Sequence, residues 1–281
     1  MKIRRPYRAG SFYAGTQEDL QKQVEKCFTH ELGPGTPAIK DGMRNIIGLI
    51  CPHAGYMYSG PIAAHSYYRL AADSKPTIVV ILGPNHTGQG SGLALMKRGI
   101  WRTPLGDTHI DEDIAEAILQ ESDIIDESEL AHTYEHSIEV QLPFLQYLYG
   151  SRFKFVPISF LMQDFGSSIE VGQAVARTLK GKKAIIIAST DMTHYEPQET
   201  AVKKDMDALK TLEKLDERDF YSIIERYHIT ACGVGPVVAL IAASKLLGAT
   251  KGQILCYKTS GDITGDYSSV VGYASAVVTL K

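Results

Sequence analysis

Short apolar runs alternate along this chain with longer segments whose apolar residues recur at helical spacing. The runs Ile46–Cys51, 77–82, 153–160 and Ala184–Ser189 predict strands, and a shorter strand is expected near 93–96. The segments between them predict helices at 18–29, 59–71, 111–121, 135–149, 167 onward, 199–214, 217–227 and 235–247. This alternation is typical of an α/β fold, in which a mostly parallel sheet lies between two helical layers.

The end of the chain departs from the alternation. Two apolar strands at 253–258 and 270–280 are separated by a turn rich in glycine and aspartate, which predicts an antiparallel hairpin. The expected sheet is therefore mixed, with helices on both faces and three layers in all. At 281 residues, the chain is expected to form one α/β domain spanning residues 1–281.

Three of the apolar runs end in a turn that carries a histidine. His53, His86 and His194 each lie a few residues past the last apolar residue of one run. If the three runs are parallel strands of one open sheet, their carboxyl ends lie along one edge, which is where open α/β sheets bind ligands. The three imidazoles are therefore expected to converge on one crevice.

Two of these histidines form a candidate metal site with one cysteine. Neutral imidazole nitrogens at neighbouring strand ends can bind a transition metal, which makes His53 and His86 candidate ligands. Cys232 is the third candidate, because it lies just ahead of the helix at 235–247, where a helix dipole lowers the pKa of a thiol. The alternatives are hydrogen-bonded loop histidines and a small cysteine packed under a turn.

Asp191 and His194 are candidate catalytic residues on the turn after Ala184–Ser189. The aspartate can orient the imidazole and tune its basicity, as in other acid–base pairs. The alternative is that Asp191 only caps the segment that follows. His136, on the helix expected at 135–149, is a candidate for lining the same crevice and binding substrate.

His132, Glu135 and His136 match the short H-x-x-E-H pattern of inverted zinc proteases. On a helix, the two histidines would share one face and bind zinc, with Glu135 as the general base. A helix capped by Thr133 would leave His132 outside it and break this geometry. So short a pattern often matches by chance, so the zinc-hydrolase hypothesis ranks last.

Composition and charge argue against several classes of function. The 29 basic and 32 acidic residues give a net charge of −3, which argues against a nucleic-acid-binding surface and an anionic membrane as partners. Arg4, Arg5 and Arg8 form a small basic cluster, expected to be a solvated or internally paired arm.

No apolar stretch approaches the ~20 residues that cross a bilayer, and no secretory signal is visible. The four cysteines form no C-x-x-C pair, so a reduced, cytoplasmic protein is expected. The sequence contains no P-loop, G-x-G-x-x-G or G-x-S-x-G motif, and no nucleotide cofactor is therefore expected.

A series of short motifs, in order along nearly the whole chain, resembles the Memo family, named for mediator of ErbB2-driven cell motility and widespread in archaea and bacteria. These motifs lie at residues 9–13, 52–56, 81–86, 102–105, 135–139, 189–194 and 232–233. His132 is not part of that pattern. The family is similar in fold to class III extradiol ring-cleavage dioxygenases, which hold iron(II) with two histidines and a carboxylate and use a further histidine as acid–base.

The resemblance implies a set of roles. His53 and His86 correspond to the histidine ligands, Cys232 takes the place of the carboxylate, and His194 corresponds to the acid–base residue. The cysteine is a departure, because a soft thiolate shifts the metal preference toward copper(I) or zinc and changes the redox behaviour of iron. Prokaryotic members often accompany a radical S-adenosylmethionine protein, and eukaryotic members are linked to metal-dependent redox activity and to recognition of phosphorylated peptides.

Three hypotheses remain open. The first is a metal-dependent redox enzyme that uses iron(II) or copper, with zinc as a further candidate, and acts with oxygen on a small or peptidic substrate. The second is a binding module that recognises a (phospho)peptide or another anionic ligand, or chaperones a metal ion, without turnover. The third is a zinc hydrolase at the H-x-x-E-H segment. A homo-oligomer is compatible with each.

Overall fold

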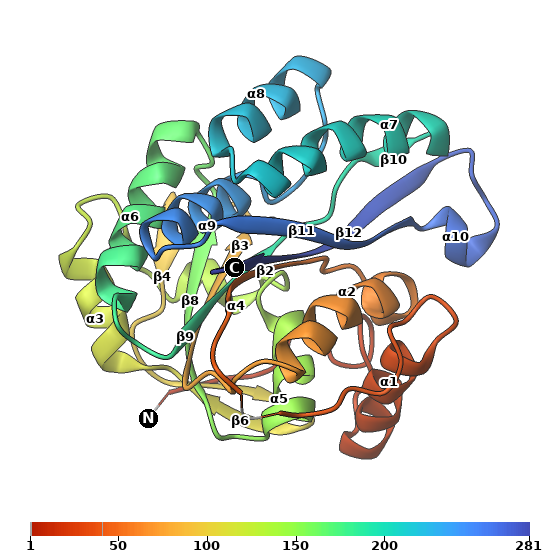
Figure 1. The fold of residues 1–281 in the computed structure, drawn as a ribbon. Coiled ribbons are helices and arrows are strands. Elements are labelled where there is room, and N and C mark those ends of the chain that lie inside the picture. Colours follow the sequence, from red (N-terminus) through yellow and green to blue (C-terminus); the bar gives the residue numbers. More distant parts are fainter. Residues whose placement is uncertain (1, 41) are drawn as a thin grey trace.

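The computed structural model describes residues 2–40 and 42–281, and a mixed sheet forms the middle of three layers (Figure 1). Its strands within that part of the chain are β2 (Ile46–Cys51), β3 (Ile78–Pro84), β4 (Leu93–Leu95), β7 (Asp126–Glu127), β8 (Lys154–Phe160), β9 (Ala184–Ser189), β10 (His194–Glu196), β11 (Lys251–Thr259) and β12 (Val270–Thr279). They lie in the order β10-β12-β2-β9-β3-β8-β4-β7, with β11 paired to β12.

Four parallel strands form the centre of this sheet. β2 pairs with β9, β9 with β3, and β3 with β8, so the four apolar runs predicted as parallel strands lie side by side. Nearly every residue of these strands is buried, as expected for parallel strands covered on both faces. The C-terminal strands β11 and β12 pair antiparallel, and β12 pairs antiparallel with β2, so the predicted hairpin and mixed sheet are confirmed.

Helices cover both faces of the sheet, as Figure 1 shows. One layer contains α6 (Phe165–Leu179), α7 (Gln198–Leu209), α8 (Glu217–Tyr227) and α9 (Val234–Leu246). The other contains α1 (Gln17–Thr29), α2 (Tyr56–Ala71) and α5 (Leu142–Tyr149). The shorter helices are α3 (Glu112–Gln120), α4 (Leu130–Thr133), α10 (Gly261–Thr264) and the 3-10 turns η1 (Glu139–Gln141) and η2 (Lys210–Lys214).

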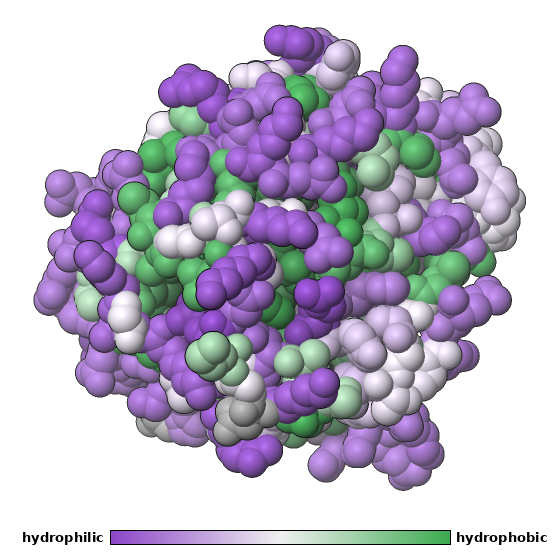
Figure 2. Space-filling model, viewed as in Figure 1, coloured by the Kyte–Doolittle hydropathy of each residue, from purple (hydrophilic) through white to green (hydrophobic). Residues whose placement is uncertain are grey.

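Helix α9 is apolar on almost every side because it lies between α6 and the strands β2, β3 and β9. A hydrophilic shell covers most of the face in Figure 2, and hydrophobic side chains show mainly across its middle. A small separate sheet of β1 (Ile3–Arg4), β5 (Ile100–Thr103) and β6 (Gly106–His109) lies beside the main one. In the described part of the chain, no helix has both the length and the apolar character needed to span a membrane.

The prediction of one helix over residues 135–149 is wrong for the first half of that range. α4 ends at Thr133, residues 134–138 form a turn, and only α5 is a regular α-helix. The Glu135 side chain accepts hydrogen bonds from the backbone N–H groups of His136 and Ser137, which replaces helical bonding there. Pro143 lies in the first turn of α5, where it is tolerated.

The start of α6 also differs from its expected position. The capping side chain is Asp164, which accepts a hydrogen bond from the Ser167 backbone N–H, so the helix begins at Phe165 instead of at the serine pair. An aspartate at this position satisfies a free N–H and interacts favourably with the helix dipole.

Of the basic cluster near the N-terminus, Arg4 is internally paired. It is buried and forms an ion pair with Glu139 at 2.6 Å between Nη1 and Oε2. It also donates to the carbonyls of His132 and Glu135. The arm therefore ties the turn at 134–138 to the body of the protein.

Candidate metal centre

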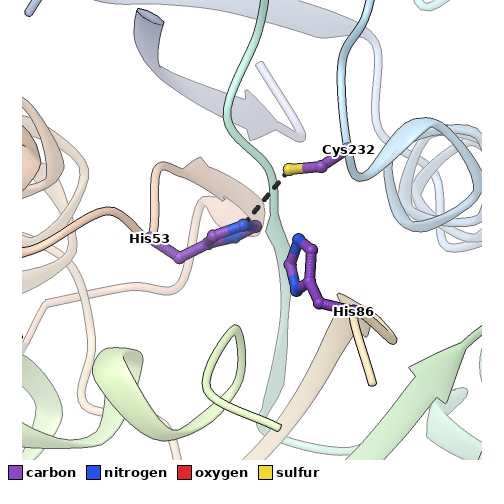
Figure 3. A group of neighbouring side chains, drawn as sticks. All are labelled: His53, His86 and Cys232. Carbon is purple, nitrogen blue, oxygen red and sulfur yellow. Dashed lines mark hydrogen bonds between the residues drawn. The ribbon is translucent and has the colours of Figure 1, made fainter. Parts of the chain in front are cut away.

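The predicted histidines lie at one edge of the sheet. His53 follows β2, His86 follows β3, and His194 follows β9, and all three of these strands run in the same direction. Cys232 lies in the turn just ahead of α9. Nitrogen atoms of His53 and His86 and the sulfur of Cys232 all lie within 4.8 Å of one another, and Figure 3 shows the three side chains pointing toward a common centre.

The turn that carries Cys232 packs closely against the end of β9. The Cys232 backbone N–H donates to the Asp191 carbonyl at 3.2 Å, and the Gly233 N–H donates to Thr190 Oγ1 at 3.0 Å. A Cβ atom on Gly233 would lie 2.5 Å from the Ser189 carbonyl oxygen, so the approach requires glycine. The cysteine is thus held by the same strand end that carries Asp191.

Hydrogen bonds determine which nitrogen of His53 carries its proton. Ser189 Oγ donates its only proton to the Ser137 carbonyl and accepts from the Gln141 side-chain amide. The remaining contact, 2.9 Å from His53 Nδ1, must therefore be donated by the imidazole. His53 then carries its proton on Nδ1 and presents the lone pair of Nε2, which lies 3.2 Å from Cys232 Sγ.

His86 and His194 have the same tautomer for a similar reason. His86 Nδ1 lies 3.0 Å from a carboxylate oxygen of Glu135, and His194 Nδ1 lies 2.9 Å from the Thr230 carbonyl. Both partners can only accept, so Nδ1 carries the proton and Nε2 is free in each ring. The site therefore offers unprotonated nitrogen atoms, the form that binds metals.

Glu135 supports His86 and is poorly suited to be a ligand itself. Together with His86 and His136 it forms a second group whose donor atoms are close enough for a metal. Its two oxygens already accept from three backbone N–H groups and from the His86 ring. Burial opposes its ionisation, but the hydrogen bond from the His86 ring and the backbone N–H of Ser137 hold the pKa of Glu135 well below its ordinary value. It is a carboxylate that orients His86, a candidate ligand.

The thiol of Cys232 differs from the sequence-based expectation. Burial raises its pKa well above the ordinary value, and the nearby Asp191 carboxyl raises it further, so the helix position does not produce a free thiolate. In the metal-free site the thiol can donate to His53 Nε2, while the Asp191 backbone N–H lies 3.2 Å from the sulfur. A coordinating cation would displace the thiol proton. Two imidazole nitrogens and one sulfur thus fit a transition metal.

A cavity of about 490 Å³ opens beside these groups. His53, His86, His136, Asp191 and His194 all line it. Four aromatic residues, Phe12, Tyr58, Tyr195 and Tyr273, also line it. The crevice therefore combines a polar floor with walls that suit a planar ring. Sequence reasoning missed this aromatic lining, which is drawn from segments with no shared pattern.

The remaining predicted residues are placed as follows. His136 lines the cavity, and burial together with the adjacent His53 lowers its pKa to about 3. Asp191 does not contact the His194 ring through a hydrogen bond; its carboxylate accepts from the His53 backbone N–H at 2.8 Å, and Thr230 orients His194. His132 is fully buried beside Trp101 and donates to the Ala94 carbonyl, so the H-x-x-E-H geometry does not form.

Comparisons with known proteins agree with this fold. A family model described as "Memo-like protein" matches residues 4–277. The chain is 50% identical over 277 residues to a MEMO1 family protein of Methanopyrus kandleri, covering 98% of each chain. It is 51% identical over 274 residues to one of Methanothermobacter thermautotrophicus, covering 97% of this chain and 99% of that one. The crystal structure of an uncharacterized protein from Escherichia coli K12 has a similar fold, with a TM-score of 0.53 at 12% identity, covering 83% of this chain and 99% of that one.

Proposed function

The chain belongs to the family of Memo-like proteins, and we propose that it is a metal-dependent redox protein with iron or copper held by His53, His86 and Cys232. The observation that carries the proposal is the convergence of these three donors within 4.8 Å. The two imidazoles are oriented by the hydrogen bonds that they donate to Ser189 and Glu135, which is the arrangement that supports metal-ligating histidines in general.

The surrounding residues define what the site can do. Iron or copper, when bound, supplies one-electron and oxygen chemistry. His194 can accept a proton at Nε2 from a molecule in the cavity, because its Nδ1–H is held by the Thr230 carbonyl. The substrate in this proposal is a small molecule or a peptide side chain that fits the cavity.

The first test is a metal count on protein purified without oxygen. We expect about one iron or copper per chain by elemental mass spectrometry, lost in His53→Ala and in Cys232→Ser. The matched controls are His109→Ala and Cys256→Ser, which remove a histidine and a cysteine outside the cluster and should keep the metal.

The outcomes separate the hypotheses. No metal in the native protein, even after reconstitution with iron(II), copper(I) and zinc, would contradict the metal-dependent proposal and leave the crevice as a site of ligand recognition. Metal binding without oxygen consumption in a substrate screen, and without an effect of His194→Ala, would favour a binding or metal-carrying role.

A further inference from the structure

Arg8 has an unusual environment next to the crevice. Its guanidinium lies over two aromatic rings, with Cζ 4.6 Å from the centre of the Tyr7 ring and 4.7 Å from that of Phe12. Its Nε atom is buried and has no hydrogen-bond partner. Within residues 2–40 and 42–281, no carboxylate pairs with this guanidinium, whereas Arg4 is fully paired with Glu139 and two carbonyls.

An arginine that is half-buried and unpaired requires an explanation. Removing a guanidinium N–H from water without a partner costs free energy, and native proteins rarely leave such a donor unsatisfied. The flanking rings hold the group flat but offer it no acceptor. What remains available is the planar edge of the guanidinium, the part that binds an oxyanion through two parallel hydrogen bonds.

The position of Arg8 connects it to the crevice. Phe12, the ring beneath the guanidinium, lines the cavity and packs against His136 with ring centres 4.8 Å apart. Arg8 therefore lies one ring away from a histidine of the crevice, and its positive charge contributes to the lowered pKa of His136. Arg8 does not itself line the cavity, but Ser11 and Phe12 do, so a ligand that extends past the Phe12 ring would meet this charge.

The charges around the cavity favour one kind of anion. No lysine or arginine is among the described residues that line it, and the one acidic side chain among those residues is Asp191. A doubly charged phosphate would meet the single cation of Arg8 and the repulsion of Asp191, whereas a singly charged carboxylate is matched by one guanidinium. The aromatic walls suit a ring attached to that carboxylate.

We infer that Arg8 binds the carboxylate of a small ring-bearing ligand whose ring occupies the crevice. The inference rests on the proposed function in one respect, because it treats the crevice as the place where the substrate binds. It names a recognition residue and a substrate class, and it does not require that the metal be present.

The test is a ligand-observed NMR titration of the full chain with benzoate, its neutral analogue benzamide, and phenyl phosphate. Benzoate should bind the unmodified chain better than benzamide does. Arg8→Gln should weaken benzoate binding roughly tenfold or more, because a charge-assisted bidentate contact is lost. Arg5→Gln removes the same charge from the exposed neighbouring arginine and should leave the affinity within about twofold.

The second variant is Arg8→Lys, which keeps the positive charge but not the planar guanidinium that donates two parallel hydrogen bonds. We expect its affinity for benzoate to lie between those of Arg8→Gln and the unmodified chain. Equal benzoate affinity in the unmodified chain and Arg8→Gln, or no benzoate binding at all, would overturn the inference. Tighter binding of phenyl phosphate than of benzoate would overturn the choice of a carboxylate. Repeating the titration with metal-free and zinc-loaded protein separates the two proposals, because the Arg8 effect is expected in both.

Discussion

At the scale of single residues, the crevice depends on side chains that touch no ligand. Ser189 is the clearest case, because its hydroxyl accepts from His53 and from Gln141 while donating to the Ser137 carbonyl. This bonding leaves His53 one tautomer, with Nε2 available. Metal binding costs less free energy when a ligand already has the tautomer and orientation that the metal requires.

Ser189→Ala should therefore weaken metal binding without removing a ligand. We expect the affinity for zinc or copper(I), measured by competition with a chromophoric chelator, to fall roughly 10–100-fold. The control is Ser159→Ala on β8, which β3 separates from β9 and where the buried hydroxyl has no partner. Unchanged affinity in Ser189→Ala would show that Ser189 does not orient the ligand.

At the scale of elements, the site is formed by turns that are far apart in the sequence and lie close together because their strands belong to one sheet. The strands Ile46–Cys51 and Ala184–Ser189 were predicted with the bounds that the structure shows, because uninterrupted apolar runs are the strongest sequence signal for buried strands. The turn at 134–138 was not predicted, because Glu135 bonds to its own backbone neighbours and overrides helix propensity.

The hydrogen-bond partners of the site residues could not be predicted from the sequence either. Thr230 orients His194, and Asp191 accepts from His53, because the turns at the sheet edge pack together in three dimensions. Nothing in the spacing of Asp191 and His194 distinguishes this arrangement from a catalytic pair. The convergence of His53 and His86 was predictable because it needs only parallel strands that end at one edge of the sheet, whereas the position of Cys232 depends on the packing of its turn against the end of β9.

Gly233→Ala tests how closely the Cys232 turn must approach β9. The added methyl would lie 2.5 Å from the Ser189 carbonyl oxygen and 2.7 Å from Thr190 Cβ, so it has little room to adjust. We expect destabilisation of about 1–3 kcal/mol and weaker metal binding, because Cys232 must move away from His53. Gly166→Ala in α6, whose Cβ would have its nearest neighbour at 3.5 Å, should change neither quantity measurably.

At the scale of the whole molecule, the protein folds around histidines that stay neutral. Burial lowers the pKa of His53 well below its ordinary value and the pKa values of His132 and His136 to about 3. In the unfolded chain these groups titrate near 6.5. As the pH falls below that value, these histidines bind protons in the unfolded state but not in the folded state. The metal-free protein should therefore lose stability in acid.

His132 allows this effect to be measured away from the metal ligands. Each such histidine should contribute a loss of about 1.4 kcal/mol per pH unit between about pH 6.5 and 3. Urea unfolding of the metal-free chain at pH 7 and pH 5 should therefore show a smaller loss in His132→Gln than in the unmodified chain. The exposed His109→Gln serves as the comparison. Equal losses in all three proteins would show that His132 is protonated in the folded state.

The order of the strands also has a consequence for biosynthesis. β2 and β3 are made early, but they are not neighbours, because β9 lies between them and is made about a hundred residues later. A nascent chain on the ribosome has His53 and His86 but neither the strand that brings them together nor Cys232. The three donors of the proposed metal site therefore come together only in the nearly finished polypeptide.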